Sequence, residues 1–153
     1  MSDKKSAVID LASLDTAALC ERGAELELNS PATGEPLGVY LTLAGVDSKA
    51  WRRAASALAE KRARQRHRVT ADEVRTGTIE ILARCTLAWR GVVVSGQELP
   101  CNVENARELY SRFPWICEQA DAFCSDRGAF PGESPTPWPP PSPPRRRAAR
   151  ATC

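Results

Sequence analysis

Two short stretches near the N-terminus alternate polar and apolar side chains. Residues 25–28 read ELEL and residues 37–43 read LGVYLTL. Such alternation is typical of strands with one buried face, because successive side chains point to opposite sides of a sheet. The segment between them, NSPATGEP, contains two prolines and a glycine, which favour turns. The sequence therefore predicts a β-hairpin with a long loop.

Three other segments carry apolar residues at helical spacing. The first can begin at Ser13 or Asp15 and end at Gly23, which have the residue types of helix caps. The second begins at Asp47 or Ser48, and the third at Thr70, which forms a capping-box pattern with Glu73. The apolar stripes of the second and third helices consist of Trp51, Ala54, Ala55 and Leu58, and of Val74, Thr78, Ile81, Leu82 and Cys85.

The stretch 87–130 reads as a second complete unit. A β-rich run over 87–94 precedes Ser95-Gly96, a pair suited to the positive-φ positions of a two-residue hairpin turn. We expect this run to form a hairpin that returns as far as Pro100.

Two helices should follow this hairpin. Asn102 is a good N-cap, and Pro114 ends one helix while suiting the first turn of the next. We expect Gly128 to cap the second helix. The apolar faces consist of Val103, Ala106, Tyr110 and Phe113, then Ile116, Ala120, Phe123 and Cys124.

Together these elements predict an α+β fold, in which an N-terminal β-hairpin and a second short hairpin pack with four to five helices. Residues 1–21 are expected to form a partly disordered N-terminal segment, and residues 22–130 the α+β domain. Residues 131–153 hold eight of the twelve prolines, together with Arg145, Arg146, Arg147 and Arg150. This composition cannot build a core, so it predicts an extended, disordered tail.

Composition and charge place the chain among cytoplasmic proteins. No run approaches the roughly 18 apolar residues that a membrane span requires, so we expect no membrane association. The first residues, MSDKKSAVIDLASLD, carry aspartates through their apolar part, which a secretory signal does not favour. The formal net charge of the chain is +2, and its basic residues are concentrated in the tail (131–153) and in the run 61–68.

The six cysteines do not follow a recognisable metal-binding or disulfide pattern. They stand at positions 20, 85, 101, 117, 124 and 153, with no CxxC, and the single histidine, His67, lies in an arginine run. Because free cysteine is often buried, we interpret most of them as buried thiols. A disulfide and a metal site are the weaker alternatives.

No motif predicts catalysis. The chain lacks GxxxxGK[ST], GxGxxG and HExxH. Neighbouring acids such as Asp72 and Glu73 fit the first turn of a helix, where carboxylates interact favourably with the helix dipole. We therefore predict that the protein is not an enzyme and has no catalytic residue, cofactor or metal.

Two groups of residues are candidates for binding. Aromatic side chains on apolar stripes are frequent interface anchors, and the candidates are Trp51, Trp89, Tyr110, Phe113 and Trp115. The second group is a basic patch consisting of Lys61, Arg62, Arg64, Arg66 and Arg68. A solvated helix end explains the patch best, because cations oppose the negative pole of a helix. An acidic protein partner ranks next, ahead of nucleic acid, since no aromatic residue is interleaved to stack on bases.

Two parts of the sequence resemble a family of phage proteins. They read SPATGEPLGVYLTLAGVDSKAWR and TLAWRGVVVSGQELPCNVENARELYSRFPWICEQADAF, and the likeness covers residues 22 to 130. Its most specific pieces are Trp89-Arg90-Gly91, Ser95-Gly96, Glu104-Asn105-Ala106-Arg107 with Leu109-Tyr110, and Phe113-Pro114-Trp115-Ile116. This pattern is similar to that of tail assembly chaperones from bacteriophages and prophages with long, non-contractile tails.

The resemblance implies a role in tail morphogenesis in the bacterial cytoplasm. Proteins of this family are thought to coat the tape measure protein and to recruit tail tube subunits, and a longer product is often made by ribosomal frameshifting. We accordingly expect a homo-oligomer that binds an extended helical partner. Two alternatives stay open: a structural virion component, such as a tail tube or head–tail connector subunit, and a nucleic-acid-binding accessory protein.

Overall fold

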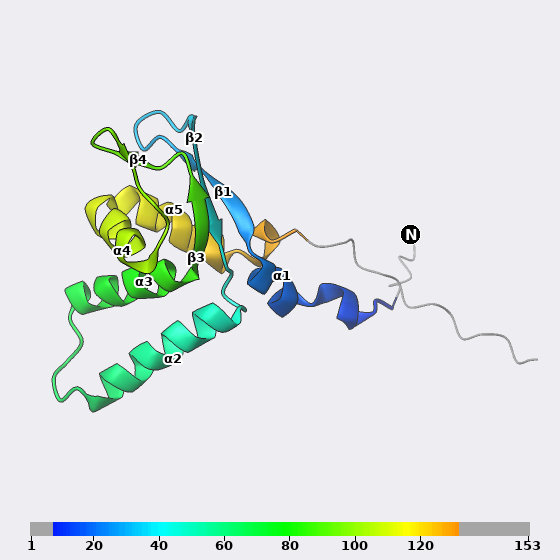
Figure 1. Cartoon of the computed structure of the whole chain (residues 1–153). Coiled ribbons are helices and arrows are strands. Elements are labelled where there is room, and N and C mark those ends of the chain that lie inside the picture. Colours follow the sequence, from blue (N-terminus) through cyan, green and yellow to red (C-terminus); the bar gives the residue numbers. More distant parts are fainter. Residues whose placement is uncertain (1–7, 132–153) are drawn as a thin grey trace, which may run out of the picture. The chain divides into compact units, whose positions relative to one another are not determined.

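The computed structural model of the chain describes residues 8–131 (Figure 1). Within this range it contains five α-helices, a three-stranded antiparallel sheet and a two-stranded antiparallel sheet, which confirms the predicted α+β class. The elements are η1 (Leu11–Leu14), α1 (Thr16–Arg22), β1 (Ala24–Asn29), β2 (Pro36–Leu43), α2 (Lys49–Arg64), α3 (Ala71–Cys85), β3 (Thr86–Arg90), β4 (Val93–Val94), β5 (Gln97–Glu98), α4 (Val103–Arg112), α5 (Pro114–Ser125) and η2 (Arg127–Ala129).

The compact body of the protein begins at Asp15. Helix α1 therefore belongs with the body rather than with the N-terminal segment, which was expected to extend to residue 21. The 3-10 turn η1 belongs to a separate unit. The predicted Pro/Arg-rich tail, apart from Pro131, lies outside the described residues.

Local hydrogen bonds define the helix starts as the sequence predicted. The side chains of Asp15, Ser48, Thr70 and Asn102 accept hydrogen bonds from the backbone N–H three residues later, at 2.7–3.3 Å. Glu73 completes the capping box by accepting from the Thr70 backbone N–H at 2.8 Å. The prediction for Gly128 was wrong: α5 already ends at Ser125, and Asp126 is its C-cap. Gly128 instead lies in η2, where its N–H donates to the Asp126 side chain at 2.9 Å.

The main sheet has the order β1-β2-β3. Leu28, Leu41 and Leu43 are buried on one face. On the other face, the Arg90 guanidinium donates to the Glu25 carboxylate at 2.7 Å and lies 3.8 Å from the centre of the Tyr40 ring. The alternation in the sequence thus separates an apolar face from a charged one.

The run 87–94, expected to form one strand, is divided between two sheets. Its first part, β3, pairs with β2, and Leu41 lies opposite Trp89. The chain turns at Gly91, whose φ is +77°, before β4 pairs with β5. The turn between β4 and β5 has positive φ at both Ser95 and Gly96, as predicted for a two-residue hairpin turn.

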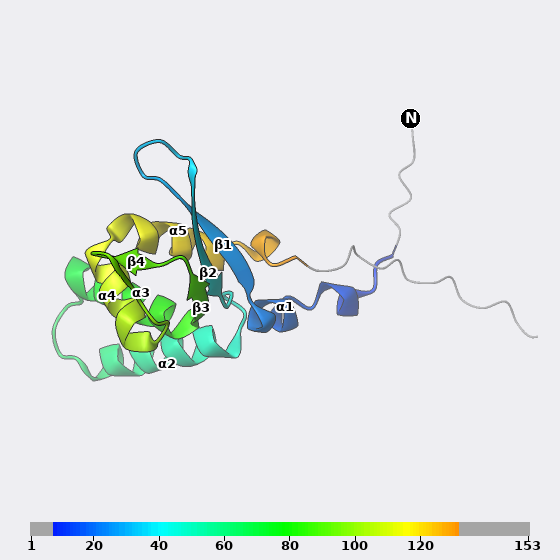
Figure 2. The same cartoon turned by 45° about the horizontal axis from the view of Figure 1, so that its top comes forward.

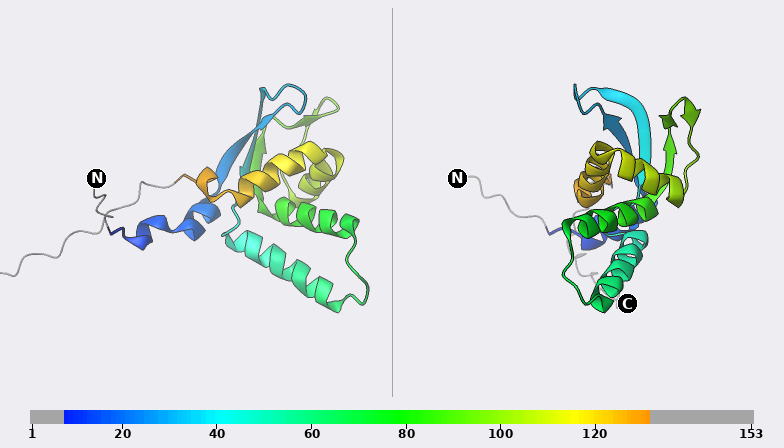
Figure 3. Two further views of the ribbon diagram at one scale, coloured as in Figure 1. Left: turned by 180° about the vertical axis from the view of Figure 1, so that it is seen from behind. Right: turned by 90° about the vertical axis from the view of Figure 1, so that its left-hand side faces the viewer.

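Helix α3 lies between α2 on one side and α4 and α5 on the other (Figures 1 and 3). Because α3 is covered from two directions, its buried positions do not form a single stripe. They are Gly77, Ile79, Leu82, Ala83 and Cys85, whereas Val74, expected on the buried stripe, is 49% exposed. Helix α2 is the outer helix (Figure 2) and has one buried residue, Ala54, among its described positions.

Candidate binding surfaces

Tyr110, one of the five candidate aromatic residues, lies inside the core. Its side chain is fully buried, and its hydroxyl lies 2.7 Å from Thr86 Oγ1. Burial in the core raises the pKa of the Tyr110 phenol well above its usual value. In this conformation Tyr110 has no surface to offer a partner, and its aromatic ring stabilises the fold instead.

Trp51 and Trp89 also contribute to packing. Both are partly buried and pack against the hydrophobic core. The indole Nε1 of Trp89 donates to the backbone oxygen of Leu99 at 2.7 Å, which ties β3 to the segment after β5. Neither tryptophan is among the described residues that line the two grooves below.

Phe113 and Trp115 form the part of the aromatic set that meets at a groove. Pro114 occupies the first position of α5, so the chain turns sharply at Phe113 between α4 and α5. The two rings meet edge to face, with centroids 6.4 Å apart, a favourable arrangement for aromatic pairs. The Arg112 guanidinium lies 5.5 Å from the centre of the Phe113 ring.

These two rings border an apolar groove of about 220 Å³, here called the aromatic groove. Its walls come from strands β1 and β2, from the segment around β4, and from the corner between α4 and α5. The β1–β2 loop and the β4–β5 hairpin extend from the same end of the sheet (Figures 1 and 3). The lining residues are Leu28, Leu37, Val39, Gly91, Val92, Val93, Val94, Leu109, Phe113, Trp115 and Ile116.

The aromatic groove contains no ionisable side chain among the described residues that line it. Its lining includes Leu37 and Val93, which are 45% and 60% exposed. Such a surface offers no group for acid–base or nucleophilic chemistry, but it suits apolar side chains from another molecule. The sequence analysis did not single out Leu37 or Val93, because strand alternation alone does not show which outward-facing apolar residues border a groove.

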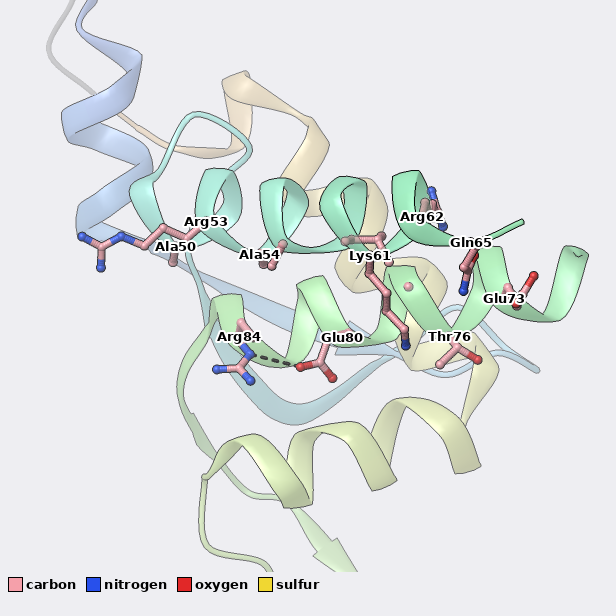
Figure 4. A pocket seen from close by; sticks show the side chains of 13 residues that line it. Ala50, Arg53, Ala54, Lys61, Arg62, Gln65, Glu73, Thr76, Glu80 and Arg84 are labelled. Carbon is pink, nitrogen blue, oxygen red and sulfur yellow. Dashed lines mark hydrogen bonds and ion pairs between the residues drawn. The ribbon is translucent and has the colours of Figure 1, made fainter. Parts of the chain in front are cut away.

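A second, larger groove of about 700 Å³ runs between α2 and α3, and we call it the α2–α3 groove (Figure 4). Helix α2 and its C-cap contribute Ala50, Arg53, Ala54, Ala57, Leu58, Lys61, Arg62 and Gln65. Helix α3 contributes Glu73, Thr76, Gly77, Glu80 and Arg84. Figure 4 shows the Lys61 side chain extending from α2 toward α3.

The two carboxylates of the α2–α3 groove already have partners. Glu80 accepts hydrogen bonds from Arg84 Nε at 3.1 Å and from Arg107 Nε and Nη2 at 2.5 and 2.8 Å. The hydrogen bond from Arg107 is the main cause of the lowered pKa of Glu80. The other carboxylate, on Glu73, accepts from the Thr70 backbone N–H and bonds His67 Nε2, both at 2.8 Å, and these contacts lower its pKa.

The structure divides the predicted basic patch. Lys61 and Arg62 line the α2–α3 groove, whereas Arg64 ends α2, and Arg66 and Arg68 are exposed in the connection to α3. At the same end of the groove, the buried Gln65 Oε1 has no hydrogen-bond partner among the described residues. Buried polar atoms in proteins rarely lack a hydrogen-bond partner.

The described cysteines carry free thiols. Cys20, Cys85 and Cys124 are buried, as the sequence predicted, and Cys101 and Cys117 are partly exposed; Cys153 lies outside the described residues. Burial raises the pKa of the Cys85 thiol to about 12. Within residues 8–131, no three side chains of histidine, cysteine, aspartate or glutamate are grouped so that they could hold a metal ion.

Comparison with known proteins gives no match to a family, to a curated protein or to a solved structure. Among the described helices, none has the length and apolar character needed to span a membrane.

Proposed function

We propose that this protein is an assembly factor of the tail assembly chaperone type, which binds an apolar helical segment of a larger protein partner. The tape measure protein of a phage tail is the partner that the sequence resemblance implies, and tail tube subunits are the proteins to be recruited. The observation that carries the proposal is the aromatic groove, a solvent-accessible surface lined by apolar side chains.

The size of the aromatic groove favours insertion of a few side chains. At about 220 Å³ it is smaller than the roughly 300–1,000 Å³ typical of small-molecule sites. An amphipathic helix presents apolar residues on one face at i, i+3 and i+4, and such residues can enter a hydrophobic groove. Phe113 and Trp115 supply aromatic anchors for this contact.

Repetition would strengthen a contact of this size. One groove binds few side chains, so each contact should be weak, but several copies along one long helix would act together. This arrangement explains why a self-associating protein suits the role. Several copies bound along the partner helix would also keep its apolar face away from water until assembly.

The decisive experiment is co-expression with a tape measure protein from the same genome, followed by pull-down of the complex. Charge is introduced at the groove by the double variant Leu37→Lys/Val93→Lys. Both side chains are substantially exposed, and a lysine at position 93 lies opposite Glu98 in the β4–β5 pair, so folding should be preserved. The matched control is Val74→Lys, an exposed apolar position outside both grooves.

We expect the wild type and Val74→Lys to capture the partner and to increase its soluble fraction. The groove variant should lose both effects while keeping the same thermal unfolding midpoint. Capture that is unchanged in the groove variant would contradict the proposal, as would the lack of any complex with the wild type. Recovery of the protein in stoichiometric amounts from purified particles would instead support a structural virion component.

A further inference from the structure

We propose that the α2–α3 groove is a second binding site, specific for an acidic amphipathic helix of a protein partner. This site does not depend on the proposed function, because its residues, its chemistry and its place in the fold differ from those of the aromatic groove. The argument rests on the shape of the groove, the small residues at its centre and its unpaired cations.

The shape of the groove matches a helix in length. Its lining on α2 extends from Ala50 to Arg62 and on to Gln65, and its lining on α3 extends from Glu73 to Arg84. At 1.5 Å per residue these stretches correspond to roughly 16–23 Å. An incoming helix of three to four turns would fill this length.

Small residues at the centre allow a close approach. Ala54 and Ala57 line one side, and Gly77 lines the other. A Cβ atom on residue 77 would lie 2.7 Å from Leu58 Cδ2 and 2.9 Å from Arg62 Nη2, so side chains of α2 already occupy the space beside Gly77. Ala57 is exposed, so side chains of alanine or leucine size on a partner helix can lie against this part of α2, whereas Leu58 and Arg62 cover Gly77 on the α3 side.

The unpaired charges of the groove are positive. Arg53, Lys61 and Arg62 line it and form no ion pair within the described part of the chain. Both lining carboxylates, by contrast, are held by the hydrogen bonds described above. A partner that carries carboxylates along one helix face would therefore meet complementary charge.

The spacing of the cations fits one face of a helix. Arg53 and Lys61 are eight residues apart on α2, which corresponds to about 12 Å along its axis. Carboxylates at positions i and i+7 or i+8 of an antiparallel partner helix span a similar distance. Alanine or leucine residues between them would lie against the small residues of the groove.

The lining favours a peptide over nucleic acid. No aromatic side chain is present among its described residues to stack on bases. A helix can place its few carboxylates next to the arginine and lysine side chains and leave the remaining contacts uncharged.

The test uses the full-length protein and a synthetic, fluorescently labelled peptide of about 15 residues, long enough for partial helicity. Glutamates occupy one face at i, i+4 and i+7, with alanine and leucine between them. Fluorescence anisotropy compares the wild type with Arg53→Glu/Lys61→Glu. The matched control is Arg66→Glu/Arg68→Glu, which makes the same change in charge outside the groove.

We expect Arg53→Glu/Lys61→Glu, the groove variant of this test, to bind the acidic peptide at least about tenfold more weakly than the wild type. Arg66→Glu/Arg68→Glu, the linker variant, should bind within about twofold of wild type, because only groove cations contact the ligand. A peptide with glutamine in place of glutamate should bind as weakly to wild type. Circular dichroism checks that both variants fold. The Leu37→Lys/Val93→Lys variant should bind the peptide normally, which separates this site from the aromatic groove.

Three results would overturn the proposal. The first is failure of the wild type to bind the acidic peptide. The second is an equal loss of affinity in the groove and linker variants, which would indicate general electrostatic attraction. The third is tighter binding of a short DNA duplex than of the peptide at the same salt concentration, with the stronger salt dependence typical of phosphate contacts.

Discussion

The fully buried Tyr110 and the partly buried Thr86 are joined by a hydrogen bond of 2.7 Å between their hydroxyl groups. Thr86 Oγ1 also donates to the backbone oxygen of Leu82 at 2.8 Å. Since the threonine hydroxyl has one proton, the Tyr110 phenol must be the donor to Thr86. These two successive hydrogen bonds connect α4 to the junction of α3 and β3, where the helical layer meets the sheet.

Removing the hydroxyl group of Tyr110 should destabilise the fold by a small amount, and removing its whole aromatic side chain should destabilise it by a large amount. We expect Tyr110→Phe to lower the free energy of unfolding by about 1 kcal/mol, the usual contribution of a buried hydrogen bond. Tyr110→Ala should cost about 3–5 kcal/mol, because it leaves a cavity among packed side chains. Urea denaturation followed by circular dichroism measures both.

Tyr40→Phe is the control for the loss of a phenol hydroxyl. The Tyr40 ring lies beside Arg90 on the charged face of the sheet and is partly exposed. Its substitution should change the free energy of unfolding by less than about 0.5 kcal/mol. Equal losses for Tyr40→Phe and Tyr110→Phe would show that the buried hydroxyl chain has no special contribution.

Features that depend on neighbouring residues were predictable from the sequence. The helix starts at Ser48, Thr70 and Asn102 follow from a side chain and a backbone N–H three residues away. The Phe113–Trp115 contact also has a local cause, because a proline separates the two residues and turns the chain.

Features that depend on distant segments were not predictable in this way. The pairing of β3 with β2 places Trp89 opposite Leu41, and no local pattern distinguishes this from a separate hairpin. The apolar period assigned Tyr110 to a buried face, but it could not show whether that face meets the core or a partner. Both grooves likewise arise from segments that are brought together by folding.

The salt bridge between Asp47 and Arg127 predicts a dependence of stability on pH. Arg127 Nε and Nη2 donate to the two Asp47 oxygens at 2.6 and 2.9 Å. This contact, with a hydrogen bond from Thr16, lowers the pKa of Asp47 to about 2. A carboxyl whose pKa is lowered by folding stabilises the protein above its unfolded pKa near 4, and this stabilisation is lost as the pH falls toward 2.

Asp47→Asn should therefore lower the free energy of unfolding at pH 7 by about 1 kcal/mol, a value for a partly exposed pair. The difference between variant and wild type should shrink as the pH falls from 4 to 2. Urea titrations at pH 2, 3, 4 and 7 measure it. Glu25→Gln, which breaks the more exposed pair with Arg90, should cost less; a constant difference at every pH would contradict the assignment.

Gly91 and Gly96 provide a matched test of backbone conformation and packing. Both have positive φ, +77° and +79°, but a Cβ on residue 91 would lie 2.8 Å from the backbone oxygen of Gly38, whereas one on residue 96 would meet nothing within 4 Å. Gly96→Ala should cost about 1–2 kcal/mol from backbone strain alone. Gly91→Ala should cost about 3 kcal/mol, because the clash adds to the strain.

Thermal unfolding and urea titration of the two alanine variants measure this difference. Gly91 also lines the aromatic groove, so Gly91→Ala should weaken partner capture more than Gly96→Ala does. Equal stability of the two variants would mean that the chain near Gly38 moves aside without cost.

The free thiols should differ strongly in reactivity, because the thiolate is the reactive form and burial opposes its formation. The Cys85 thiol is buried and has its pKa raised to about 12, so its thiolate fraction at pH 7 should be on the order of 10⁻⁵. Cys101 and Cys117 are partly exposed, and burial raises their pKa values as well. We expect these two to react first with a maleimide in the folded protein.

Mass spectrometry of tryptic peptides after timed labelling measures each rate. Labelling in urea is the control, since unfolding exposes every thiol and should make the rates similar. Labelling of folded Cys85 at the rate of Cys101 would show that the region where α3 meets β3 opens readily. Slow labelling of Cys85 in the wild type and faster labelling in Tyr110→Ala would instead link its protection to the packing around the tyrosine ring, because a cavity there lets water reach the end of α3.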